Sequence, residues 1–177
     1  MKVEQIILLI INLLGGIAVI GSYIFGLKGQ SGGTSVLWGG VPVKIRPIYT
    51  VSMLISALSY FAFLFYIFFR LDPSQVRIAG TSGFTMFYII FIVMLGASAL
   101  WMPLTNMYVA NPGTGLWVGI RLVLAVVGLA SIGLFLALLT MQGKVLGVAY
   151  GLAIGGSAYF AFHTAILDAV VWAALFK

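Results

Sequence analysis

The chain has 177 residues, of which 63% are hydrophobic and 7% charged, and its mean hydropathy is +1.20. A soluble domain carries about 45–50% apolar and about 25% charged residues, so this composition excludes an ordinary water-soluble globule and a disordered chain. The nine Lys and Arg residues give a net charge of +6 but form no basic stripe, so we expect no nucleic-acid partner. Most of them lie at the ends of apolar runs, where they anchor membrane segments to lipid headgroups.

Five apolar stretches are long enough to cross the hydrocarbon core, which takes about 20 residues in a helix. They cover residues 5–27, 48–70, 84–109, 115–141 and 145–176. Lipid cannot satisfy backbone polar groups and the runs do not alternate as barrel strands do, so each is predicted to be a helix. The first is too long for a signal peptide and has no A-x-A-like site, so we expect it to be retained. The prediction is one all-α domain over residues 1–177, an integral membrane bundle of five transmembrane helices with its termini on opposite sides.

The connection over residues 28–47 is the one long loop, and its five glycines and two prolines stop both helix and strand. Asn111-Pro112-Gly113 predicts a tight turn, so the third and fourth helices are expected to be antiparallel neighbours. Four basic residues fall on one side of the membrane and four on the other, so the positive-inside rule leaves the orientation open. We expect a multi-pass protein of a bacterial inner membrane or an organelle membrane.

The last predicted helix carries small residues at intervals of four, which place them on one face. Such ridges promote close backbone packing inside lipid, where apolar burial cannot drive association. One ridge runs through Ala149, Ala153, Ser157, Ala161, Ala165, Ala169 and Ala173, and a second through Gly143, Gly147, Gly151 and Gly155. They indicate either packing within the bundle or the seam of a homodimer. Pro103 is expected to kink the third helix, either around a cavity or only to improve packing.

Ionisable side chains within a span are costly and are therefore candidate functional residues. Arg121 lies about 10 Å into the fourth helix, and Asp168 about 13 Å from the end of the fifth. Because these two ends share one side of the membrane, we expect an ion pair, with Asn106 in the same layer. The pair either fixes helix register or borders the mouth of a ligand cavity. The long first loop is expected to close that cavity as a lid through Trp38, Lys44 and Arg46.

His163 lies about 7 Å deeper than Asp168. Five residues around an α-helix place it away from the Asp168 face, so a packing role is favoured over metal or haem ligation. One His and three acidic residues, with no cysteine, exclude most metal sites, and none is predicted. The sequence has no Ser-His-Asp order, H-E-x-x-H motif or phosphate loop. No motif therefore indicates the active site of a soluble enzyme.

Three short stretches carry a resemblance to a known family. They are Pro47-Ile48-Tyr49-Thr50-Val51, Ala99-Leu100-Trp101-Met102-Pro103-Leu104 and Leu167-Asp168-Ala169-Val170-Val171-Trp172. They are similar to the Pro-x-Trp-Thr, Leu-Trp-Ser-Pro-Leu and Leu-Asn-x-x-x-Trp segments in helices 2, 3 and 5 of the tryptophan-rich sensory protein family, also called translocator protein or TspO-like. The chain departs from the family at Ser98, which stands where an Asn is usual, and at Gly156-Ser157, which replaces Pro-Tyr.

This resemblance implies a pocket within the bundle, capped by the first loop, that binds sterols or tetrapyrroles such as protoporphyrin and haem. It also implies a homodimer, and some bacterial members of the family promote light-dependent porphyrin breakdown. By motif position, Tyr49, Trp101 and Asp168 would line or support the pocket.

The expected function is that of a membrane-embedded binding, transport or sensory protein for an apolar ligand with an anionic end. The candidate ligand-binding residues are Trp38, Tyr49, Trp101, Asn106, Arg121, His163 and Asp168. Two alternatives stay open, a structural or accessory subunit of a membrane complex and a membrane enzyme acting on porphyrin or lipid. The expected partners are the lipid bilayer, a small apolar ligand, with haem or protoporphyrin as the candidate, and a second copy of the chain.

Overall fold

A computed structural model describes residues 2–28, 34–80 and 83–176. Within these ranges five helices are long and apolar enough to cross a membrane, so the prediction of an all-α bundle of five transmembrane helices is confirmed. Residues 29–33 of the predicted loop lie outside the described residues.

The first four spans are regular α-helices: α1 (Val3–Lys28), α2 (Arg46–Phe69), α3 (Thr85–Ala110) and α4 (Thr114–Thr140). The fifth span is one continuous rod in three parts: α5 (Val148–Phe162), the π-helix η3 (His163–Trp172) and α6 (Ala173–Leu175). Two short 3₁₀ helices, η1 (Thr34–Trp38) and η2 (Val43–Ile45), shape the long loop. Each predicted end lies within three residues of the observed one, because bilayer thickness sets the length of an apolar run.

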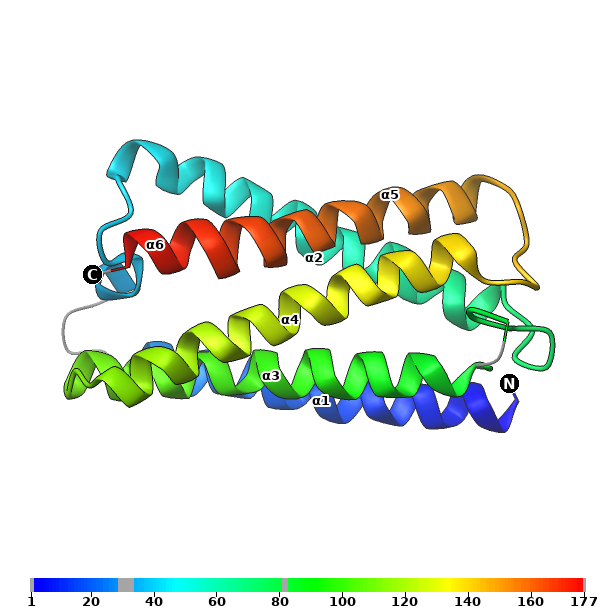
Figure 1. Cartoon of the computed structure of the whole chain (residues 1–177), viewed down its shortest axis with the longest axis horizontal. Helices are drawn as coiled ribbons and strands as arrows, with labels where there is room; N and C mark the ends of the chain where they lie inside the picture. The colour runs from blue at the N-terminus through cyan, green and yellow to red at the C-terminus, as the bar shows by residue number, and fades with distance from the viewer. Residues whose placement is uncertain (1, 29–33, 81–82, 177) are drawn as a thin grey trace.

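The helices form two sides joined by α4 (Figure 1). α1 packs on α3, α3 on α4, α4 on α5 and η3, and α5 on α2. The Tyr60 hydroxyl donates to Asn12 Oδ1 at 2.5 Å and so links α2 to α1. The N- and C-termini lie at opposite ends of the bundle, as an odd number of spans requires (Figure 1).

The alanine ridge of the last span packs inside the bundle. Ala153 and Ser157 are fully buried, and a Cβ added to Gly128 of α4 would lie 2.8 Å from the Ala165 Cα atom. The glycine ridge does not pack inside the bundle. Gly151 and Gly155 are exposed, and a Cβ added to either would meet nothing within 4 Å. Small residues on the inner face therefore let α4 and the fifth span approach closely.

Gly143, the first residue of the glycine ridge, lies before the predicted helix over residues 145–176, in the turn that precedes α5. Its φ is +76°, a conformation that favours glycine, and a Cβ there would lie 2.4 Å from the Gln75 carbonyl oxygen. Arg77 and Gln142 form an isolated antiparallel bridge beside this turn. This bridge joins the loop after α2 to the turn before α5, at the end of the bundle where the N-terminus of the chain lies (Figure 1).

Candidate functional site

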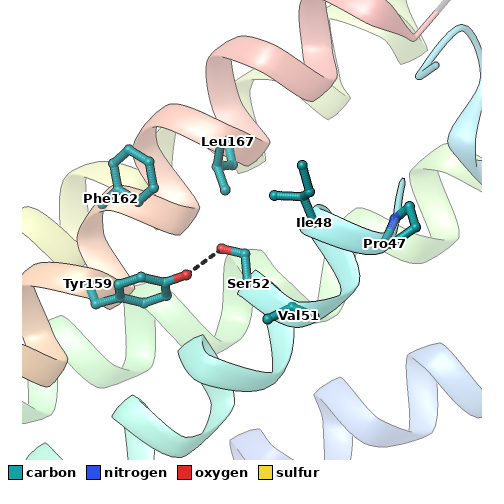
Figure 2. Close-up of a pocket in the computed structure, with 7 residues that line it drawn as sticks. All are labelled: Pro47, Ile48, Val51, Ser52, Tyr159, Phe162 and Leu167. Carbon is teal, nitrogen blue, oxygen red and sulfur yellow. Dashed lines mark hydrogen bonds between the residues drawn. The ribbon is translucent and has the colours of Figure 1, made fainter. Parts of the chain in front are cut away.

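An open groove of about 430 Å³ lies between the start of α2 and the fifth span (Figure 2). Its volume falls in the range of about 300–1,000 Å³ that is typical of ligand pockets. It is lined by Pro47, Ile48, Val51, Ser52, Tyr159, Phe162 and Leu167. The groove exists because α2 packs along α5 but diverges from the following turns of the fifth span (Figure 1).

The groove opens on the face that the bundle presents to lipid. Ile48, Val51 and Phe162 are 67%, 55% and 47% exposed, and all three belong to membrane-spanning segments. Ser52 lies six residues after Arg46, the first residue of α2, which places it about 9 Å along the helix, and its side chain is buried. A molecule that enters from the bilayer therefore meets apolar walls first and hydroxyl groups at the floor.

A chain of hydrogen-bonding side chains lies behind that floor. Ser52 Oγ hydrogen-bonds to Tyr159 OH and to His163 Nδ1, each at 2.9 Å. His163 Nε2 in turn lies 3.6 Å from Asp168 Oδ2. His163 is buried, whereas the Asp168 side chain is 33% exposed. This polar chain of side chains joins α2 to both halves of the fifth span. It also gives partners to polar groups whose burial in lipid would otherwise be costly.

The π-helix brings His163 and Asp168 together. In a π-helix each N–H bonds to the carbonyl five residues back, so residues five apart lie on one face. The Ala173 N–H donates to the Asp168 carbonyl in this way. The prediction that His163 faces away from Asp168 is wrong because it assumed α-helical spacing.

Arg121 does not form the predicted ion pair with Asp168. Among the described residues, a basic side chain lies within 4.0 Å of a carboxylate in two pairs, Lys2–Asp72 and His163–Asp168, and the second is an ion pair only when His163 is protonated. The Arg121 side chain is exposed, with its guanidinium 5.8 Å from the centre of the Trp117 ring. α4 turns Ile120 and Leu124 toward the core, which leaves the intervening Arg121 outside it.

Asn106 makes a contact between α3 and α1. Its Nδ2 donates to the Gly26 carbonyl oxygen at 3.1 Å, and so links α3 to α1. A Cβ added to Gly26 would lie 2.9 Å from the same Nδ2 atom, so the two helices are close at this point. The structure therefore gives Asn106 a helix-linking contact.

The described part of the long loop packs onto the end of the bundle, where aromatic side chains lie against it. The Trp172 indole donates to the Leu37 carbonyl oxygen at 3.1 Å, and its ring stacks on Phe176 at 4.4 Å. Trp38 meets Tyr49 edge-on, and the Arg46 guanidinium lies 5.8 Å from the centre of the Trp38 ring. Lys44, the third predicted lid residue, is exposed on the outside of the loop.

Tyr49, Trp101 and Asp168 lie around the boundary between this aromatic cluster and the groove. The Tyr49 hydroxyl donates to the carbonyl oxygen of Leu167, a groove residue, at 2.6 Å. Asp168 directly follows Leu167 along η3. Trp101 packs against Tyr23 at 5.6 Å, and its buried Nε1 has no hydrogen-bond partner among the described residues.

The fold and composition define a multi-pass integral membrane protein. No family model, curated protein or solved structure matches the chain. The groove, the polar chain and the aromatic cluster are therefore the features that indicate its function.

Proposed function

We propose that the protein binds an amphipathic ligand that enters laterally from the bilayer and lies in the groove between α2 and the fifth span. The observation that carries this proposal is the combination of lipid-facing apolar walls with two hydroxyl groups, those of Ser52 and Tyr159, at the floor. Ligand sites are mostly apolar, with a few placed polar groups that orient the ligand. An acyl chain would pack against Ile48, Val51 and Phe162, while a polar link in the ligand meets the hydroxyl groups.

An anionic end of the ligand would lie at the membrane surface. Arg46 directly precedes Pro47, the outermost groove residue along α2, and Lys44 lies two residues before Arg46. Cations at this level attract anionic lipid headgroups. The ligand class is thus an anionic lipid whose ester or other polar link reaches Ser52.

A second candidate function is tetrapyrrole or sterol binding of the TspO-like kind. It is favoured by the buried Trp101 Nε1 without a hydrogen-bond partner among the described residues, because a ligand acceptor would satisfy that donor. It is also favoured by the packing of Trp101 against Trp172 at 5.4 Å, since these residues come from two of the three family-like stretches. This ligand would lie at the aromatic cluster instead of the groove.

The test is native mass spectrometry of the full chain, released gently from vesicles of phosphatidylcholine that contain phosphatidate. We expect the wild type to retain phosphatidate selectively and Val51→Trp, which fills the groove, to lose it. Leu54→Trp is the matched control, because Leu54 is 62% exposed on the same helix but does not line the groove. Equal retention by all three proteins would contradict the proposal.

Protoporphyrin IX added to the same samples tests the second candidate. Porphyrin that stays bound to Val51→Trp but is lost from Trp101→Phe would assign the ligand to the aromatic cluster. The same spectra report the number of copies, which checks the expected homodimer.

A further inference from the structure

The polar chain behind the groove has the order carboxylate, imidazole, hydroxyl. Asp168 Oδ2 lies 3.6 Å from His163 Nε2, and His163 Nδ1 lies 2.9 Å from Ser52 Oγ. A hydroxyl in contact with a base, which a third group orients, is the arrangement of an activated nucleophile. The hydroxyl belongs to a residue that lines the groove, so the nucleophile is placed where the proposed ligand lies (Figure 2).

We propose that Ser52, His163 and Asp168 form an acyl-transfer site that cleaves a long-chain ester held in the groove. This proposal rests on the proposed function, because the groove must first bind the lipid. Tyr159 OH, 2.9 Å from Ser52 Oγ, is the donor for the oxygen of the ester carbonyl. A hydroxyl in this place can stabilise the negative charge that develops on that oxygen.

Ser52 Oγ attacks the ester carbonyl carbon, its proton passes to His163 Nδ1, and the carbonyl electron pair moves onto the oxygen. The carbonyl then re-forms, the bond to the leaving alcohol breaks, and the alcohol leaves with the proton from His163. Water attacks the acyl-Ser52 ester with His163 again as base, which releases the fatty acid and restores the serine. Asp168, whose Oδ2 lies 3.6 Å from His163 Nε2, favours a proton on Nε2 by its charge and so leaves Nδ1 free to act as the base.

Two serines on the same helix provide a control. Ser52, Ser56 and Ser59 are all buried, and they follow one another at about one-turn intervals along α2. Of the three, Ser52 lines the groove and contacts His163. Ser56→Ala therefore removes a buried hydroxyl of equal exposure, 4%, without touching the proposed site.

The experiment treats the full chain in lipid nanodiscs with a fluorophosphonate that carries a long alkyl chain, and follows its mass. We expect one label per chain on Ser52, with fluoride displaced. Ser52→Ala should carry no label, His163→Gln should react about 100-fold or more slowly, and Ser56→Ala should react at the wild-type rate. No labelling of the wild type, or equal labelling of Ser52→Ala, would overturn the proposal.

A second variant separates a chemical role from a structural one. Ser52→Cys keeps a nucleophile of similar size. With p-nitrophenyl palmitate this variant should gain the mass of one palmitoyl group. The double variant Ser52→Cys with His163→Gln should gain the same mass much more slowly. Equal acylation of the two variants would mean that His163 only supports the fold. Phosphatidate retention that is lost in Val51→Trp, without any labelling of Ser52, would leave the binding function standing and remove the catalytic one.

Discussion

The two halves of the fifth span differ in how they meet α2. In α5, Gly156 lets the backbones approach so closely that an added Cβ would lie 3.1 Å from the Ser59 carbonyl oxygen. In the next turns, Phe162 and Leu167 face the start of α2 across the groove, and the helices lie apart (Figure 2). Both halves are apolar, so hydrophobicity does not distinguish them. Side-chain size at the contact decides whether two membrane helices close on each other or leave room for a ligand.

Gly156→Leu should give the largest effect on the close half. Its Cβ meets backbone at Ser59, which cannot give way as a side chain does, so overpacking should lower the free energy of unfolding by about 1–3 kcal/mol. Gly155→Leu is the control, because a Cβ there meets nothing within 4 Å. Unfolding in mild detergent, followed by circular dichroism, compares the two. Equal losses would mean that this contact does not hold α2 to α5.

The open half can be tested through the contact between His163 and Asp168. Asp168→Asn removes a carboxylate oxygen that lies 3.6 Å from His163 Nε2, so the nitrogen NMR shifts of His163 should change. Asp72→Asn, in the Lys2–Asp72 pair, is the control and should leave those shifts unchanged. Equal His163 shifts in the wild type and Asp168→Asn would contradict the contact.

Trp172→Phe should have a smaller effect, at the end of the span. It keeps an aromatic ring against Phe176 but removes the indole donor to the Leu37 carbonyl, a loss of about 1 kcal/mol. Amide hydrogen exchange in residues 34–45 should therefore become faster. Trp117→Phe, in the same cluster, is the control, and it should leave exchange in that segment unchanged. Equal exchange in both variants would contradict a fastening role for the indole.

Asp72→Asn should have the smallest effect, far from the groove. The hydrogen bond from Lys2 holds the pKa of Asp72 at about 2, below its ordinary 3.8, and Ser74 adds to this. A lowered pKa in the folded state gives stability that is present above about pH 4 and is lost as the pH falls through about 2. Because both side chains of the Lys2–Asp72 pair are about half exposed, salt should weaken the effect. Unfolding midpoints of wild type and variant, measured over this pH range in low and high salt, should converge at the acid end. Parallel curves would contradict this.

The sequence predicted the spans well and the site poorly, for one physical reason. The length of an apolar run is set by the bilayer, so the ends of the helices can be counted directly. Counting residues also gives depth, and on that basis Arg121 and Asp168 were placed at one level. It does not give the direction in which a side chain points, and Arg121 lies outside the core. Nor does any residue mark the π-helix that brings His163 and Asp168 to one face.

The lateral opening of the groove has a consequence for how the site would be filled. A ligand that arrives through the hydrocarbon never passes through water, so its aqueous solubility does not set its occupancy. What matters is its mole fraction among the neighbouring lipids, which compete for the same apolar walls. A cell that remodels its membrane would thereby change the loading of this protein without altering the protein itself.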